Sequence, residues 1–459
     1  MVGIIGGKKY EVVGFIVLLC LTLPLFLYKI GDSSLVSWDE AWYGEIAKNV
    51  LKGDILNLKF NQAAYIDHPP AGFWFIALSQ LLFRINEFGT RFASAAFGFL
   101  TLIVIFLLGR NLFNGFVGFL SAIALVSAPW FLYRARSGNL DTILTFFLVL
   151  SIYLAVKAAK DKHFLIPLSF SLSLFFLTKS IIPFTIIPVL IILFWRSKIY
   201  KLKDFLVPIV IFLILFGGWF ISQYRIDPTF HIHYLAIGAP EVNLEASYTK
   251  NLLLSKEYLH SGIGRWFWPT IIAIFIGSFF LKKKFLIFFA FFVTFFTPFI
   301  LSHKGHIWHL IPLFPVLILN FMGASFEVWK KILKKPTLVY LILAIFTFYI
   351  SFSQIKQNWY QFIDIPTYVS DEAILSKEAG KYEHPYYIEG DFTPAAVFYS
   401  DKMVKRVRIE GLVDLFKSDS TFLLNTKLGV LNEYGILPIQ YRIIKADRDR
   451  VLVIKDKFL

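Results

Sequence analysis

The chain has 459 residues, of which 57% are hydrophobic and only 17% are charged. A soluble domain usually carries about 25% charged residues, so this composition excludes an ordinary soluble protein and also a disordered chain. The net charge of +15 would suggest nucleic acid as a partner. However, residues 355–459 hold 15 Lys and Arg against 15 Asp and Glu, so the whole excess lies in residues 1–354, between apolar runs. This distribution indicates an integral membrane protein with no nucleic-acid partner.

The apolar runs predict the membrane-spanning helices, each of which needs roughly 20 residues. We expect about eleven spans, at residues 12–30, 91–109, 114–132, 140–158, 163–178, 180–195, 204–222, 266–281, 285–301, 307–325 and 337–353. The run at 70–84 is shorter. If it does not cross, the short loops of one face hold 17 Lys and Arg and those of the other face hold four. Positive residues gather in the cytoplasm, so we expect 70–84 to lie along the membrane interface.

The same rule places the N-terminus in the cytoplasm and three longer segments outside it: residues 31–90, residues 223–265 and the tail. The protein is therefore expected in the cell (inner) membrane, as a 1–354 membrane domain followed by a 355–459 domain. In the tail, short apolar runs at 386–388, 422–424, 439–444 and 451–454 alternate with helix-like stretches at 394–399, 411–416 and 426–433. This alternation predicts a small α/β domain.

Polar residues are scarce, so their clusters are informative. The first cluster follows the first span and reads Ser-Trp-Asp-Glu-Ala-Trp-Tyr-Gly-Glu from Ser37. Asp39 and Glu40 lie between aromatic residues there, which suits a catalytic carboxylate. They also suit a helix N-terminus that Ser37 caps with Glu40 in a capping box, and both interpretations stay open.

The second cluster, Tyr65-Ile66-Asp67-His68, stands directly before two prolines. Asp67 and His68 are either part of a plain turn or hold a substrate group, with Tyr65 beside them. The third cluster contains Arg134, Arg136 and Asp141. Asp141 starts a span and could simply cap that helix, whereas the arginines before it make an anion site plausible.

Two further clusters contain cations. Lys179 lies between two nearly continuous apolar runs, where it either extends to the membrane surface or binds a lipid phosphate. The stretch 302–309 contains Lys304 and the histidines His303, His306 and His309. Three histidines at this spacing spread around a helix and have no acidic ligand beside them, so hydrogen bonds to a phosphate or sugar fit better than a metal site. We predict no metal ligands, and the pattern leaves a divalent-cation requirement open.

Together, these clusters provide carboxylates that could activate a hydroxyl, cations for a phosphate, and aromatic residues for a sugar ring or lipid chain. The nucleotide-binding pattern G-x-x-x-x-G-K-[ST] is absent, so an activated donor would be carried by a lipid. A transporter or flippase of a polyprenyl-linked or anionic lipid would use the same cations. It would usually contain internal repeats, which the sequence lacks. A non-catalytic assembly subunit is the third alternative.

The ordered motifs resemble the GT-C glycosyltransferases, in particular the group of protein O-mannosyltransferases and lipid A aminoarabinose transferases. The resemblance covers about residues 36–325 and is carried by WDEAWYGEIAKNVLKGD, YIDHPPAGFW, NEFGTRFASAAFG, RSGNLDTILTFF, FLTKS and SHKGHIWHLIPLFP. It implies a GT-C-like membrane domain and transfer of a sugar from a polyprenyl phosphate to a lipid, glycan or protein hydroxyl, with inversion at the anomeric carbon.

The resemblance also implies roles for single residues. Asp39 corresponds to the main catalytic carboxylate, Asp141 to a second essential acid, and Lys179 to a lysine near the donor phosphate. Asp67 and His68 occupy the acid–base pair before the prolines. The stretch 302–309 departs from the family's Lys-rich version. We therefore expect Glu40 as a reserve base, and His68, Lys179, Arg136, Lys304, His303, His306 and Tyr65 as donor-binding residues. The C-terminal domain carries no motif that can be assigned, and we expect it to do no chemistry and either to position the acceptor or to close over the cavity.

Overall fold

The computed structural model describes residues 8–195, 197, 199–236, 248–281, 285–301, 305–391 and 393–456. Its contacts divide the chain into two compact units, which are described separately. The first unit comprises Met1–Ile30, Ile66–Phe75 and Arg91–Ile365, and the second comprises Gly31–Tyr65, Ile76–Thr90 and Pro366–Leu459. The second unit therefore unites the segment after the first helix with the C-terminal tail. The sequence-based boundary at 354/355 assigned those two parts to different domains.

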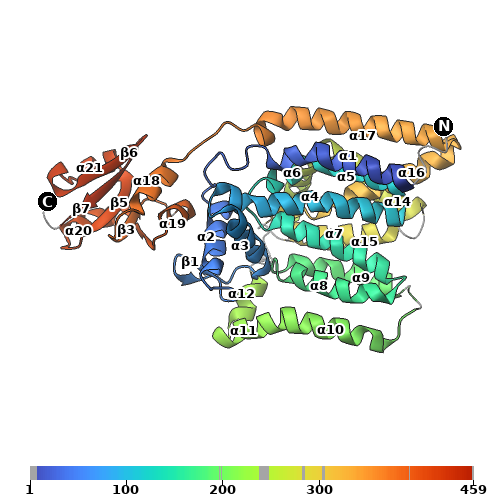
Figure 1. Cartoon of the computed structure of the whole chain (residues 1–459), viewed down its shortest axis with the longest axis horizontal. Helices are drawn as coiled ribbons and strands as arrows, with labels where there is room; N and C mark the ends of the chain where they lie inside the picture. The colour runs from blue at the N-terminus through green and yellow to red at the C-terminus, as the bar shows by residue number, and fades with distance from the viewer. Residues whose placement is uncertain are drawn as a thin grey trace. The chain divides into compact units, whose positions relative to one another are not determined.

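The first unit is a bundle of apolar helices (Figure 1). In chain order its helices are α1 (Lys8–Leu27), α4 (Glu87–Leu112), α5 (Gly115–Ser127), α6 (Pro129–Ala135), α7 (Asp141–Ala158), α8 (Leu165–Phe176), α9 (Ile187–Trp195), α10 (Leu206–Phe212), α11 (Gly218–Ile226), α12 (Phe230–Ala236), α13 (Tyr248–Ile263), α14 (Phe267–Phe280), α15 (Phe285–Leu301), α16 (Leu313–Leu333) and α17 (Pro336–Asn358). Neighbouring pairs such as α7 with α8 and α14 with α16 pack along their lengths.

Each expected span coincides with a helical segment of this bundle. Six segments of the described chain are long and apolar enough to cross a membrane, and α5 with α6 forms a seventh that is bent by 74°. The others, α1, α8, α9 and α15, are apolar but shorter. The segment Leu202–Ile226 shows only 6% burial, as expected for a helix that faces lipid. The prediction of a helical membrane protein is thus confirmed.

Two details differ from the predicted helices. The run expected at 266–281 begins earlier, because α13 and α14 together form one segment, Lys250–Phe279. The short run at 70–84 forms α3 (Ala71–Phe83), which with 13 residues is shorter than the roughly 20 needed to span a bilayer. Its interfacial position stays a prediction.

The second unit contains a five-stranded sheet of strand order β4-β3-β5-β7-β6. Its strands are β3 (Tyr386–Glu389), β4 (Val404–Val407), β5 (Phe422–Lys427), β6 (Arg442–Asp447) and β7 (Arg450–Lys455), and its helices are α18 (Asp371–Ala379), α19 (Pro394–Ser400), α20 (Leu412–Lys417) and α21 (Leu428–Glu433). Strands β4, β3 and β5 are parallel and the β5–β7 and β7–β6 pairs are antiparallel. The expected small α/β domain is therefore present.

The segment after the first span packs onto this domain. It forms α2 (Asp39–Leu51) and a hairpin of β1 (Lys59–Phe60) and β2 (Ala63–Ala64). Leu35 and Ala41 join Ala395 and Phe398 of α19 in one apolar cluster. The approach is close at Gly44, where an added Cβ would lie 3.1 Å from the Phe398 ring. Residues 31–65 and the tail therefore share one core. That both lie outside the cytoplasm stays a prediction.

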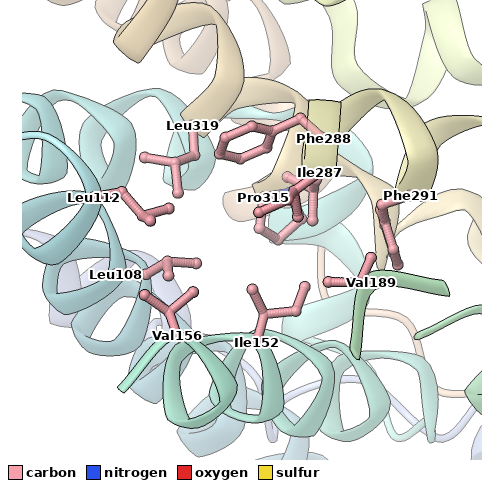
Figure 2. A pocket seen from close by; sticks show the side chains of 11 residues that line it. Leu108, Leu112, Ile152, Val156, Val189, Ile287, Phe288, Phe291, Pro315 and Leu319 are labelled. Atoms are coloured by element: carbon pink, nitrogen blue, oxygen red, sulfur yellow. The ribbon is translucent and has the colours of Figure 1, made fainter. Parts of the chain in front are cut away.

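A cavity lies inside the first unit between α4, α7, α9, α15 and α16 (Figure 2). All of its lining side chains are apolar, among them Leu108, Ile152, Val189, Phe291 and Leu319. Its volume of about 20 Å³ is close to that of a single water molecule. Without a polar partner such a void stays dry, so it provides packing tolerance and no chemistry.

Candidate active site

The centre of the candidate site is a buried carboxylate between two cations in the first unit. Asp141 opens α7 and is 1% exposed. Its Oδ2 accepts a hydrogen bond from Arg134 Nη2 at 2.7 Å, and its Oδ1 accepts one from Lys179 Nζ at 2.5 Å. Arg134 ends α6, whereas Lys179 follows α8, and each is 7% exposed. Three segments of the bundle therefore meet at one ionic cluster with two positive charges and one negative charge.

Asn139 explains why the Asp141 carboxylate is available to these cations. The Asn139 Oδ1 accepts hydrogen bonds from the backbone amides of Asp141 and Thr142, at 2.9 and 3.2 Å, and so satisfies the start of α7. Asn139 in turn is held by Ser94, because the Ser94 Oγ accepts a hydrogen bond from the backbone amide of Asn139 at 3.1 Å. The side chain that bonds to the start of α7 is therefore that of Asn139. The Asp141 carboxylate instead forms the two ion pairs.

His68 and His309 lie within electrostatic range of this cluster, and both interact with Lys179 and Asp141. Burial and the Lys179 ammonium lower the pKa of His68 to about 3. The imidazole is therefore neutral at neutral pH and can contribute hydrogen bonds but no charge. The neighbouring Asp67 has a raised pKa because of burial.

The described part of the histidine-rich stretch lies beside the same ionic cluster, through Trp308 and His309. The Arg134 guanidinium lies over the Trp308 ring at 5.6 Å, a cation–π contact. His306 is exposed and stacks on Trp308 with ring centroids 4.5 Å apart. The predicted binding residues His303 and Lys304 lie outside the described residues. In the described chain no group of three or more His, Cys, Asp or Glu could hold a metal ion.

Arg136 lies elsewhere and contacts backbone. Its guanidinium donates to four carbonyl oxygens, those of Leu25, Tyr28, Phe362 and Ile363, at 2.6 to 2.8 Å. These carbonyls belong to the end of α1 and to the turn after α17, near two of the three places where the chain leaves the first unit. Arg136 thus ties these two exits together. A phosphate could bind the Arg136 guanidinium only by displacing one of these hydrogen bonds.

A salt bridge between Lys29 and Asp364, 2.7 Å long, reinforces the same two exits. Spacing alone could not tell Arg134 from Arg136, since both precede Asp141 in one short loop. Arg134 is separated from Asp141 by seven residues, and the intervening turn brings its side chain back to the carboxylate.

The remaining predicted residues belong to the second unit. Asp39 is the first residue of α2 and is half-buried. Glu40 is buried, and its Oε2 accepts a hydrogen bond from the Val36 amide at 2.9 Å, so it closes the start of α2. The expected capping box is thus altered, because Glu40 bonds to Val36 and the N-cap is Trp38 rather than Ser37.

Aromatic rings flank Asp39. Trp38 is 66% exposed and stacks on Trp42, which in turn stacks on Phe60. Tyr65 is buried and its ring lies 6.4 Å from that of Trp42. An exposed indole beside a carboxylate is a surface on which a sugar ring can stack, since the faces of sugar rings are apolar.

Comparisons with known proteins test the fold and the resemblance drawn from the ordered motifs. Residues 67–221 match the family model described as dolichyl-phosphate-mannose-protein mannosyltransferase. The structure of ArnT from Cupriavidus metallidurans bound to undecaprenyl phosphate superposes with a TM-score of 0.75, covering 96% of this chain and 98% of that chain at 16% sequence identity. The chain has the GT-C fold. The resemblance identified from the ordered motifs is thereby confirmed.

Two further GT-C relatives extend the comparison. An undecaprenyl phosphate-alpha-4-amino-4-deoxy-L-arabinose arabinosyl transferase from Pseudomonas fluorescens is 29% identical over 225 residues, which are 46% of this chain and 41% of that protein. The archaeal oligosaccharyltransferase AglB from Archaeoglobus fulgidus, in complex with an inhibitory peptide and a dolichol-phosphate, gives a TM-score of 0.52 at 11% identity and covers 86% of this chain and 64% of that chain. The matched region spans less than half the length of the curated relatives.

The buried ion cluster can be tested against an exposed one in the same unit. Lys162 and Asp204 form an equally short pair, 2.6 Å, but Lys162 is 44% exposed. Lys179→Ala leaves one oxygen of a buried carboxylate without its hydrogen-bond donor and should lower the free energy of unfolding by about 1–3 kcal/mol. Lys162→Ala should change it by less than about 1 kcal/mol. Thermal unfolding in detergent measures both, and equal effects would contradict the assigned burial.

Arg136 provides a second test. Arg136→Lys keeps the charge but reaches fewer of the four carbonyls, and each buried carbonyl left without a donor costs about 1–3 kcal/mol. We expect a clear loss of thermal stability and little change in donor affinity. Arg225→Lys, at an exposed position, is the control and should be near neutral. A variant of unchanged stability that binds donor lipid poorly would instead favour the predicted phosphate role.

Proposed function

We propose that the protein is a membrane glycosyltransferase that moves a sugar from a polyprenyl-phosphate donor to a hydroxyl acceptor on the extracytoplasmic side. The observation that carries the proposal is the buried cluster of Arg134, Lys179 and Asp141. Two cations against one carboxylate leave a net positive charge in a place that water hardly reaches. A phosphate leaving group, which needs cations rather than an acid, suits such a place.

The neighbouring residues fit the same chemistry. Asp141 holds both cations in fixed positions, so little reorganisation is needed when the lipid phosphate is released. A neutral His68 can hydrogen bond to a phosphate or sugar oxygen without adding charge. Two structural relatives were solved with undecaprenyl phosphate and with a dolichol-phosphate bound, which supports the class of donor.

We assign the role of general base to Asp39. In the reaction, the acceptor oxygen attacks the anomeric carbon, the bond from that carbon to the phosphate oxygen breaks, and the hydroxyl proton passes to a carboxylate. A single displacement of this kind inverts the anomeric carbon. Asp39 is half-buried beside the exposed Trp38, whereas Glu40 is occupied by the Val36 amide. Asp67 and Asp141 are assigned supporting roles, and the acceptor is a lipid, glycan or protein hydroxyl.

The base can be tested by a nearly isosteric change. Positioned proton transfer typically contributes about 10²–10⁴-fold to a rate, so Asp39→Asn should reduce turnover by that factor and leave donor binding intact. Asp32→Asn, in the same segment but exposed, should leave turnover unchanged. The assay follows acceptor-dependent release of polyprenyl phosphate by purified protein. Normal turnover in Asp39→Asn would remove Asp39 from this role, and movement of labelled donor without bond cleavage would favour a transporter.

The proposed location is the cell (inner) membrane, with a cytoplasmic N-terminus and the second unit outside. Two exposed positions test it in a Cys20→Ser background. Asp391, in the second unit, has a 99% exposed side chain, and His163, in a loop of the first unit, has a 95% exposed one. A membrane-impermeant maleimide added to right-side-out vesicles should label Asp391→Cys and spare His163→Cys until the membrane is permeabilised. The reverse pattern would invert the orientation.

A further inference from the structure

A polar cavity of about 320 Å³ lies within the second unit. Its lining residues come from α2, from the β1–β2 hairpin and from the end of α19: Glu45, Asn49, Lys52, Asp54, Lys59, Asn61, Gln62, Val397, Asp401, Lys402 and Met403. Small-molecule sites span about 300–1,000 Å³, so this cavity has room for a small ligand of one or two rings. None of the roles assigned above uses these side chains.

Fixed contacts hold the three walls together. Asn61 exchanges two hydrogen bonds with the backbone of Val404 on the edge strand β4, at 2.9 and 2.8 Å. Asn49 Nδ2 donates to the Lys59 carbonyl at 3.1 Å, which ties α2 to the hairpin. Lys52 and the buried Lys48 each lie 2.8 Å from the Asp401 carboxylate, which ties α2 to the end of α19. The cavity is therefore built in before any ligand arrives.

The charges in the lining balance. Three lysines and three acids line the cavity. The described contacts pair Lys52 with Asp401, Lys59 with Asp54 at 2.8 Å, and Glu45 with the buried Lys48 at 3.3 Å. The third lining lysine, Lys402, donates to the His384 carbonyl at 3.5 Å. At each of the three ion pairs, an ionic ligand of either sign would meet a like charge beside the attractive one. A neutral ligand with many hydroxyl groups avoids this cost, because each hydroxyl both donates and accepts.

The hairpin turn carries a residue that local structure alone disfavours. Asn61 and Gln62 form a two-residue turn with φ of 49° and 68°. Such turns strongly favour glycine at the second position, and another residue there costs of the order of 1 kcal/mol. Gln62 is exposed, yet its side chain borders the cavity. A side chain kept at a strained position beside a cavity points to a role in binding.

We propose that this cavity binds a neutral saccharide, with the amides of Asn49 and Gln62 and the paired charges contacting its hydroxyls. Met403, which is 44% exposed, provides an apolar surface for the C–H face of a ring. α2 carries both this wall and Asp39, so the saccharide is part of the glycan acceptor; this assignment, unlike the binding itself, rests on the proposed function.

The experiment uses the full chain in nanodiscs, which avoids detergents with sugar headgroups. Saturation-transfer NMR measures binding of three neutral disaccharides (maltose, mannobiose and chitobiose) and of mannose 6-phosphate as the anionic probe, without donor. At least one disaccharide should bind, and Gln62→Gly, which removes a side-chain amide but relieves the turn, should weaken it about three- to tenfold at unchanged or higher thermal stability. Arg84→Gly, at another exposed position with positive φ (74°) that does not line the cavity, is the matched control and should not affect binding.

Three outcomes would overturn the proposal: no disaccharide binds, only mannose 6-phosphate binds, or Gln62→Gly binds as tightly as the parent. None of them depends on turnover. Loss of the saccharide site would leave transferase activity with a simple acceptor intact. Failure of the Asp39→Asn prediction would refute the assigned base and leave the saccharide site standing.

Discussion

The first unit depends on one buried carboxylate. Asp141 joins the end of α6, the start of α7 and the segment after α8 through its bonds to Arg134 and Lys179. Taking these three charges out of water costs several kcal/mol per ion, so a cluster of this kind contributes little net stability. Its effect is instead to fix geometry, because neither cation can move without leaving one buried carboxylate oxygen without its donor. The excess positive charge then stays in a defined place, ready for an anion.

Features set by local chemistry could be predicted from the sequence. The membrane helices follow from apolar runs, and the tail's strands β3, β5, β6 and β7 follow from short apolar segments between helix-like ones. Strand β4 was missed because Val404-Lys405-Arg406-Val407 has two exposed cations at its centre, as an edge strand tolerates. Helix α18 was missed for a similar reason: its sequence, DEAILSKEA, is largely polar and carries no strong apolar period.

Contacts that depend on how the chain folds back on itself could not be predicted from the sequence. Both Arg134 and Arg136 stand near Asp141 in the sequence, but only the turn around Asn139 decides which one reaches it. Likewise, the sequence suggested Glu40 as a reserve base, and only the structure shows that its carboxylate accepts a hydrogen bond from the Val36 amide. The grouping of residues 31–65 with the tail depends on close approaches such as that of the Phe398 ring to Gly44. No local sequence pattern predicts such a contact. The ordered motifs did indicate the fold, because their order and spacing extend over most of the chain.

The packing of α2 onto α19 has a consequence for synthesis of the protein. Lys48 is buried, and its ammonium donates to the Phe398 carbonyl, 350 residues later in the chain. At roughly 5–20 residues per second, about 20 to 70 s pass between the translation of these two residues. During this time the face of α2 that packs against α19 has no partner. The segment around α2 can therefore pack only after the C-terminal part of the chain has been made. If the ribosome stalled late, the nearly complete chain would keep α2 exposed to chaperones and proteases.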